Sequence, residues 1–462
     1  MVDVIELLRA EVADGAVVPG DQVSEALFGD EALGIAHVRP LAAVFPSSTD
    51  EVAAILRMAD EHGIPVTARG SGTGLSGGAV PRADGIVVSF ERMASVIEVD
   101  VDNLVAVVQP GVTLDELDRL LEPMGLVYPV FPGEYSASLG GNVATNAGGM
   151  RAVKYGVTRH QVVGLEAVLP GGEVIRTGGK YVKGSTGYDL TQLIIGSEGT
   201  LAVVTEATLR VYPRCEHQAT LLAPFETLAG VTHAVPKVVA SGVGPMIVEY
   251  IDLVTMSAMA NDLGVELGVS DDIRERALAY LVIQLESAHE DRLEADMVAL
   301  AEQVADLGAM DVFILPTGAA TKLIEAREKA FWIAKGAGAD DIVDVVVPRA
   351  SIADFMDGVS VLASETSSWI AGCGHAGDGN VHLSVFQSDP EVRGGVMRGL
   401  FQLGMDLGGA ISGEHGLGKT KKKYFNELED PAKIALMRRI KAAFDPNGIL
   451  NPDNIFETKE QA

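Results

Sequence analysis

The sequence predicts an α+β protein with more than one domain, and three observations support this prediction. At 462 residues the chain is too long for one ordinary hydrophobic core, and 47% of its residues are hydrophobic, which allows full globularity. Between residues 38 and 213, strand-like apolar runs alternate with helical patterns and glycine-rich loops. After Pro213 glycine-rich loops become rare, and strands alternate with acidic helices, which indicates a separate α+β domain.

Capping residues mark the helix boundaries in the first part of the chain. Ser48-Thr-Asp-Glu51 and Thr113-Leu-Asp-Glu116 are capping boxes, in which two side chains satisfy free backbone N–H groups. Gly63 ends the first of these helices, since glycine readily adopts the left-handed conformation of a helix C-terminus. The elements expected up to residue 211 are helices at 4–12, 49–62 and 114–124, strands at 66–68, 86–89, 96–99, 104–108, 162–169 and 173–176, and two strands around a loop within 193–211.

The second part is expected to begin near residue 215. Apolar runs predict strands at 247–251, 280–285 and 312–315, and amphipathic patterns predict helices at 291–307 and 323–334. The residue patterns therefore divide the chain near residue 215.

Charge and cysteine content exclude several classes of function. The net charge of −29 argues against nucleic acid or an anionic membrane surface as a partner. Two distant cysteines, Cys215 and Cys373, argue against a disulfide framework and an iron–sulfur cluster. The acidic N-terminal helix lacks the pattern of a signal peptide, and no apolar run approaches the ~20 residues of a transmembrane helix. The sequence predicts a cytoplasmic protein, with peripheral attachment to a membrane left open.

Two glycine-rich stretches stand between apolar strands. The first, Pro65–Pro81, reads PVTARGSGTGLSGGAVP and exposes backbone N–H groups that can surround an anion. A flexible surface loop is the alternative, but the flanking strands favour a positioned, phosphate-binding loop. The second, Pro129–Gly149, has few large apolar residues and predicts a long ordered loop of functional importance. Gly196-Ser-Glu-Gly-Thr200 offers further backbone donors.

Histidines and an acid gather near the C-terminus. His375 and His382 lie in GCGHAGDGNVHL, and Glu414 and His415 lie in ISGEHGLGK. Strand alternation places His382 on the face opposite Val381 and Leu383. Two histidines and a carboxylate suit a divalent metal, although buried histidines are often only hydrogen-bonded core residues, and spacing alone leaves the two readings about equal.

These stretches closely resemble the FAD-linked oxidases of the vanillyl-alcohol oxidase and p-cresol methylhydroxylase (PCMH) superfamily. Within it they resemble the branch containing the glycolate oxidase flavin subunit, D-lactate dehydrogenase and D-2-hydroxyglutarate dehydrogenase. The resemblance implies a PCMH-type FAD-binding domain of two subdomains (1–214), a substrate-binding cap domain (215–410) and a C-terminal segment (411–462) that packs back on the FAD domain. Because no histidine lies between Gly63 and Pro81, it implies non-covalent FAD. The FAD-binding residues that it implies are Arg69, Gly70, Ser71, Gly72, Thr73, Gly74, Ser76, Pro132, Gly133, Ser138, Gly140, Gly141, Asn142, Gly148, Glu198, Gly199 and Asn451.

The same resemblance assigns roles near the C-terminus. It implies that His375, His382 and Glu414 bind a divalent metal, usually zinc, with manganese or iron as alternatives, and that His415 is the catalytic base. Arg327, by its place 48 residues before His375, matches the family's carboxylate-binding arginine. Without the resemblance, Arg327 would be read as an ordinary helix-surface residue.

The resemblance also limits the substrate. D-2-hydroxyglutarate enzymes hold a second carboxylate with a Thr and a Lys, whereas the corresponding residues here are Phe331 and Ile342. We therefore expect a small or apolar-tailed 2-hydroxy acid such as D-lactate or glycolate, in a pocket that Trp332 narrows further. The run Lys419–Lys423, with lysine at four of five positions, is read first as a solvated face, and second as a steering patch for an anionic substrate or acidic redox partner.

The expected activity is the FAD-dependent oxidation of a D-2-hydroxy acid to a 2-oxo acid. In this hypothesis Arg327 and the metal bind the substrate, His415 takes the hydroxyl proton, and flavin N5 accepts the hydride. The electrons then pass to an external acceptor, which is a partner subunit, an electron-transfer flavoprotein, a quinone or cytochrome, or oxygen. The alternatives are a D-2-hydroxyglutarate dehydrogenase and a non-catalytic flavin subunit of an oxidase complex, and a homodimer is left open.

Overall fold

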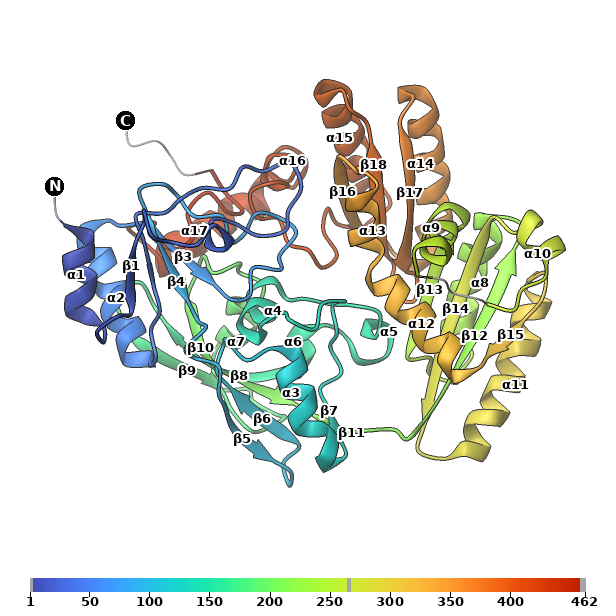
Figure 1. The fold of residues 1–462 in the computed structure, drawn as a ribbon, viewed down its shortest axis with the longest axis horizontal. Helices are drawn as coiled ribbons and strands as arrows, with labels where there is room; N and C mark the ends of the chain where they lie inside the picture. The colour runs from blue at the N-terminus through green and yellow to red at the C-terminus, as the bar shows by residue number, and fades with distance from the viewer. Residues whose placement is uncertain (1–2, 264–266, 458–462) are drawn as a thin grey trace.

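The computed structural model describes residues 3–263 and 267–457, which form two lobes (Figure 1). The N-terminal half builds one lobe from two larger sheets and a two-stranded sheet formed by β7 (Leu126–Val127) and β11 (Tyr212–Pro213), and most of the C-terminal half builds the other lobe around one large sheet. The last helices of the chain, α16 (Lys422–Leu428) and α17 (Pro431–Phe444), lie on the side of the second lobe that faces the first (Figure 1). Phe425 of α16 and Ile434 of α17 are buried in the hydrophobic core of the second lobe.

The first sheet has the strand order β1-β2-β4-β3, in which β4 pairs in parallel with β2 and β3, whereas β1 and β2 are antiparallel. Its elements are α1 (Val4–Glu11), β1 (Val17–Pro19), β2 (Ala42–Val44), α2 (Thr49–His62), β3 (Val66–Arg69) and β4 (Ile86–Ser89), with a 3-10 turn at Glu25–Leu27. The apolar face of α2, including Val52, Ile55 and Leu56, is fully buried against these strands. The sheet therefore holds the glycine-rich loop 70–81 between the ends of two buried strands, β3 and β4.

The second sheet is antiparallel, with the order β5-β6-β10-β8-β9. Its helices cover one face, where Leu117, Leu121 and Leu139 are completely buried. The elements are β5 (Val96–Asp100), β6 (Val105–Val108), α3 (Leu114–Leu121), a 3-10 turn (Glu122–Met124), β7 (Leu126–Val127), α4 (Leu139–Thr145), α5 (Ala152–Tyr155), α6 (Thr158–Gln161), β8 (Val162–Val168), β9 (Val174–Gly178), α7 (Leu190–Ile194), β10 (Val203–Arg210) and β11 (Tyr212–Pro213).

The second lobe has a seven-stranded antiparallel sheet in the order β15-β12-β14-β13-β17-β18-β16. Helices α8, α11, α14 and α15 pack on one face, whereas α9 and α12 pack on the other. The elements are β12 (His217–Phe225), α8 (Leu228–Val239), β13 (Ile247–Asp252), α9 (Leu253–Leu263), α10 (Asp271–Arg276), β14 (Ala279–Ser287), α11 (Glu290–Asp306), β15 (Phe313–Leu315), α12 (Thr317–Glu328), α13 (Ala330–Gly336), β16 (Asp341–Val346), a 3-10 turn (Arg349–Ser351), α14 (Ile352–Thr366), β17 (Trp369–His375), β18 (Asn380–Phe386) and α15 (Pro390–Asp406).

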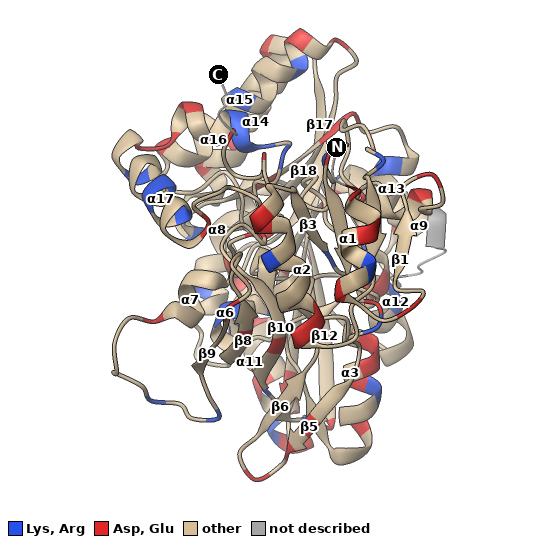
Figure 2. Ribbon diagram, turned by 90° about the vertical axis from the view of Figure 1, so that its left-hand side faces the viewer, with Lys and Arg blue, Asp and Glu red and all other residues tan. Residues whose placement is uncertain are grey.

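The C-terminal segment returns to the first lobe. After α16 (Lys422–Leu428) and α17 (Pro431–Phe444), Leu450 forms a parallel bridge with Val66 of β3. Lys441 of α17 donates hydrogen bonds to the carbonyl oxygens of Thr200 (2.7 Å) and Leu450 (2.9 Å). α17 also carries several of the basic side chains of this acidic chain (Figure 2).

The predicted α+β class is confirmed, but several local predictions need correction. The Thr113 capping box forms, whereas Glu51 bonds to the N–H of Ser47 and not to that of Ser48. The first of the two strands expected within 193–211 is instead the end of the helix α7, and the helix expected at 323–334 is two helices that break at Lys329. The stretch Pro129–Gly149 is not only a loop, because it contains the helix α4.

Candidate active site

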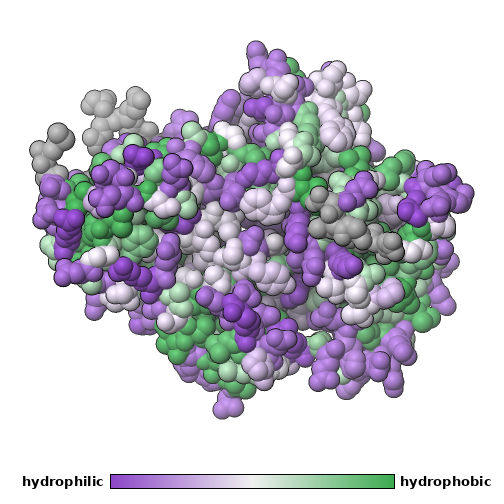
Figure 3. Space-filling model, in the orientation of Figure 1, coloured by the Kyte–Doolittle hydropathy of each residue, from purple (hydrophilic) through white to green (hydrophobic). Residues whose placement is uncertain are grey.

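A cavity of about 210 Å³ lies in the first lobe, lined by both glycine-rich stretches. Every residue that the sequence predicts to bind FAD lines this cavity except Gly133, which lines a neighbouring cavity instead. Residues Ser197 to Gly199 and Asn451 close the cavity from the β10 side and from the C-terminal segment. Figure 3 shows residues of near-neutral hydropathy between the two lobes.

The walls of this larger cavity fit a dinucleotide. A Cβ on Gly70 would overlap the Ser138 hydroxyl, and Gly72 has φ +76°, so the loop can approach a ligand through its backbone. The Ser71 N–H donates to Ser138 Oγ (3.2 Å), which ties the first stretch to the second. The buried Asn142 Nδ2 lines the cavity without a hydrogen-bond partner among the described residues. Backbone donors and a free amide suit the pyrophosphate of FAD.

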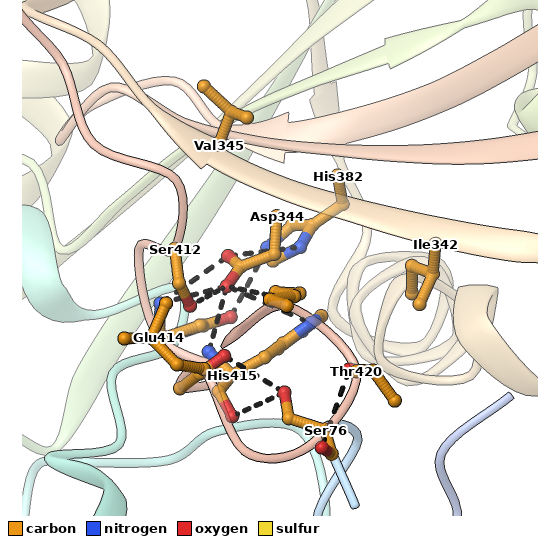
Figure 4. Close-up of polar contacts among 12 residues, drawn as sticks. Ser76, Ile342, Asp344, Val345, His382, Ser412, Glu414, His415 and Thr420 are labelled. Atoms are coloured by element: carbon orange, nitrogen blue, oxygen red, sulfur yellow. Dashed lines mark hydrogen bonds and ion pairs between the residues drawn. The ribbon is translucent and has the colours of Figure 1, made fainter. Parts of the chain in front are cut away.

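The loop 412–418, which carries Glu414 and His415, is held by a buried carboxylate, Asp344 of β16 (Figure 4). Asp344 accepts hydrogen bonds from Ser412 Oγ (2.7 Å), His415 N (2.8 Å) and Glu414 N (3.2 Å). Burial raises the pKa of Asp344, but the positive charge of the neighbouring Lys421 contributes to bringing it below its usual range. Asp344 is therefore ionised and fixes the backbone of the loop.

The first lobe holds the same loop from the other side. Glu198 accepts from Leu417 N (2.8 Å) and Gly418 N (2.7 Å). Ser76 Oγ donates to the carbonyl oxygen of His415 (2.9 Å; Figure 4). Residues predicted to bind FAD thus also position the predicted base.

The expectation that Lys419–Lys423 is a solvated face is wrong for two of its lysines. Lys421 is only 3% exposed, and its Nζ lies 3.5 Å from Asp344 Oδ2. Lys419 Nζ donates to the carbonyl oxygen of Val80 (2.6 Å). The buried anion Asp344 requires a counter-charge, which sequence spacing alone does not reveal.

His375, His382 and Glu414 converge as the sequence predicts. Glu414 Oε1 lies 3.1 Å from His375 Nε2 and 3.2 Å from His382 Nε2. The two imidazole rings are 4.8 Å apart and nearly perpendicular. Two imidazole nitrogens and one carboxylate oxygen within 4.8 Å of one another are a donor set that suits zinc, manganese or iron.

A second grouping, Asp344 with His382 and His415, fits a metal less well. The oxygens of Asp344 are already occupied by the loop N–H groups, Ser412 and the Asn380 amide (2.8 Å). His415 Nδ1, by contrast, is buried and has no hydrogen-bond partner in the described part of the chain. Burial lowers the pKa of His415 to about 4, so this imidazole is neutral and able to accept a proton.

Glu249 of β13 is a carboxylate that sequence reasoning missed. It is fully buried, and its two oxygens contact His375 Nδ1 (2.6 Å) and Arg327 Nε (2.7 Å). Burial lowers the pKa of His375, but Glu249 and Glu414 raise it to about 10. Because Glu249 holds Nδ1, the Nε2 atom of His375 is directed at Glu414 and at the position predicted for a metal.

Arg327 lies at a second cavity, of about 160 Å³, with His375, His382, Glu414 and His415. Arg327 is 7% exposed, and its Nη2 has no hydrogen-bond partner among the residues described. The reading of Arg327 as a helix-surface residue is therefore wrong for this chain. An unpaired guanidinium edge in a cavity suits a carboxylate.

Other pocket predictions have mixed outcomes. Phe331 and Ile342 line the second cavity as expected. Trp332 is 41% exposed and is not among the lining residues, so the expectation that it narrows the pocket is wrong. It follows Phe331 on α13 and so points to a different side of the helix.

The two cavities share four lining residues, Leu75, Pro132, Glu414 and His415. A group bound in the larger cavity therefore adjoins the carboxylate and imidazole that face the smaller one. This arrangement places a cavity that suits a dinucleotide beside a buried imidazole and a buried guanidinium, which are groups that a flavin-dependent oxidoreductase requires.

Comparison with known proteins identifies the family. The chain matches the FAD binding domain over residues 40–178 and the FAD linked oxidases, C-terminal domain, over residues 214–455. It is 55% identical over 445 residues to an uncharacterised FAD-linked oxidoreductase of Mycobacterium tuberculosis (96% of this chain, 97% of that protein). It is 41% identical over 417 residues to a D-lactate dehydrogenase of Archaeoglobus fulgidus (89% and 90%). The chain therefore belongs to the FAD-linked oxidases and is an FAD-linked oxidoreductase.

The structural comparison agrees with this assignment. The structure of p-cresol methylhydroxylase with substrate bound has a TM-score of 0.77 and covers 99% of this chain and 97% of its own, at 17% identity. This likeness confirms the PCMH-type fold. In the described residues no helix is long and apolar enough to cross a membrane.

Proposed function

We propose that the protein oxidises a D-2-hydroxy acid to the corresponding 2-oxo acid, with D-lactate-like acids as its substrate class. The observation that carries this proposal is the wall shared by the two cavities, where Glu414 and His415 adjoin both. A substrate in the smaller cavity would meet a cation at one end and a neutral imidazole at the flavin side. The D-lactate dehydrogenase of Archaeoglobus fulgidus supports the same substrate class.

Arg327 would bind the substrate carboxylate through its free guanidinium edge, since its Nε is already paired with Glu249. His415 would accept the hydroxyl proton, because burial keeps it neutral. His375, His382 and Glu414 would hold a divalent metal such as Zn²⁺. When bound, such a metal lowers the pKa of a coordinated hydroxyl group. FAD, when bound, supplies the two-electron acceptor for the hydrogen on Cα. An external acceptor must then reoxidise the protein.

Two alternatives remain as tests of this proposal. A D-2-hydroxyglutarate dehydrogenase would need a second cation in the smaller cavity, whereas Arg327 is the only Lys or Arg among its described lining residues. A non-catalytic flavin subunit would not need a buried, unpaired base or the convergent donor set, and both are present.

The test is anaerobic bleaching of the flavin with D- and L-enantiomers of lactate, glycerate and 2-hydroxyglutarate, and with glycolate. We expect D-lactate to bleach the flavin and L-lactate not to. Preincubation with a chelator should abolish bleaching, and added Zn²⁺ or Mn²⁺ should restore it. If none of these acids reduces the bound FAD in the presence of metal, the proposed function is wrong.

A further inference from the structure

The register of three strands arranges the side chains of the smaller cavity in rows. β18 pairs with β17 and with β16, so residues directly opposite each other share one face of the sheet. The rows on this face are Asp344–His382–Cys373, then Ile342–Ser384–Ala371, then Phe386–Trp369. Successive rows lie two residues, or about 7 Å, apart. The first row contains a predicted metal ligand, and the next two are apolar except for Ser384.

Helices α9 and α13 form the wall opposite these rows. Ala258 and Met259 of α9 and Phe331 and Ala334 of α13 line the same cavity as Arg327 and His415. The cavity thus continues from the charged cluster, past the second row, to Trp369 and Phe386, whose rings are 4.5 Å apart. We name the part beyond the first row the apolar channel.

We propose that the apolar channel binds the side chain of a 2-hydroxy acid with a long, uncharged tail, such as a 2-hydroxy fatty acid. This inference rests on the proposed function, which places the carboxylate at Arg327. A three-carbon acid would leave the second and third rows uncovered, since they lie about 7 and 14 Å from the first. A tail that ends in a carboxylate is disfavoured, because the described lining has no second Lys or Arg and includes the acid Glu328.

The experiment is a chain-length series of flavin reduction under anaerobic conditions. The probes are D-lactate, D-2-hydroxybutyrate, D-2-hydroxyhexanoate and D-2-hydroxyoctanoate, with D-2-hydroxyglutarate as the charged comparison. Each buried methylene should raise kcat/KM about fourfold, and so the step from lactate to 2-hydroxyhexanoate should raise it about 60-fold. If D-lactate reduces the flavin and kcat/KM is flat or falls with length, the channel is only an entry route and the inference is overturned. A preference for 2-hydroxyglutarate over the hexanoate also overturns it.

Two variants test whether the increase of kcat/KM with chain length arises in the apolar channel. Ala371→Leu narrows the channel from the sheet side, and Ala334→Leu narrows it from the helix side. If one of the variants does not fold, the other still tests the inference. Each should lower the hexanoate-to-lactate ratio of kcat/KM at least tenfold, with flavin content as the check on folding. Ala299→Leu, on the exposed side of α11, is the matched control and should keep the wild-type ratio. Unchanged ratios in both folded channel variants contradict the inference, whereas a failure of every acid to reduce the flavin overturns the proposed function itself.

Discussion

Replacing Glu249 with glutamine tests whether one buried carboxylate organises both the metal position and the substrate-binding arginine. Through separate oxygens, Glu249 forms an ion pair with Arg327 Nε at 2.7 Å and a hydrogen bond with His375 Nδ1 at 2.6 Å. Glutamine has the same shape but only one acceptor oxygen, so one of the two donors loses its partner. All three side chains are buried, and so water cannot replace the lost acceptor.

The contacts of Glu249 determine how much metal affinity or substrate affinity the glutamine variant should lose. Removal of a carboxylate behind a metal-binding histidine weakens metal affinity about 10- to 100-fold, or about 1.4–2.8 kcal/mol. If the amide oxygen stays with His375, the unpaired Arg327 should instead raise KM for the hydroxy acid by a similar factor. Either result leaves the flavin bound, since Glu249 is not among the described residues that line the larger cavity.

The assay is competitive titration of Zn²⁺ into chelator-stripped protein, combined with KM for D-lactate. Glu302→Gln, an exposed substitution of the same kind on α11, is the control and should change neither value. Wild-type zinc affinity together with a wild-type KM in folded Glu249→Gln would refute the reasoning.

Three further predictions concern the loop, the flavin cavity and pH. Asp344→Asn should lower the free energy of unfolding by about 3–5 kcal/mol, because it leaves the buried Lys421 without an anion. Urea unfolding measures this loss, and the double variant Asp344→Asn/Lys421→Met should recover part of it. Gly70→Ala should yield protein depleted of FAD, because the new Cβ overlaps Ser138 Oγ; full flavin content by absorbance would count against the assigned cradle. Burial raises the pKa of Glu328 to about 7, so this acid is neutral below pH 7 and anionic above it. KM for D-lactate should therefore rise between pH 6 and 8, and Glu328→Gln should flatten that rise.

Local signals in the sequence were sufficient for much of the framework. The Thr113 capping box and the αL cap at Gly63 depend on neighbouring residues, and both form. The alternation around His382 also holds, with Val381, Leu383 and Val385 buried on the opposite face. The α4 helix was missed because Gly140 and Gly141 weaken its pattern, although Leu139 and Val143 are buried in the core.

Long-range pairing explains what the sequence did not reveal at the site. Glu249 meets His375 only because β13 pairs with β17, where Tyr250 lies opposite Gly374. Asp344 and Lys421 are 77 residues apart, and neither lies in a motif that signals an ion pair. A carboxylate in a strand is visible in the sequence, but its burial is set by sheet order, which single-sequence patterns do not determine.

The rate of flavin reduction in His415→Ala tests the central claim most directly, namely that the wall shared by the two cavities carries the base. Under anaerobic conditions D-lactate should reduce the flavin about 10²- to 10⁴-fold more slowly than in the wild type, with FAD content unchanged. His233→Ala, which replaces an exposed histidine of α8 whose Nδ1 lies 2.7 Å from the Ala229 carbonyl oxygen, should react at the wild-type rate. A wild-type rate of bleaching in His415→Ala would contradict the account.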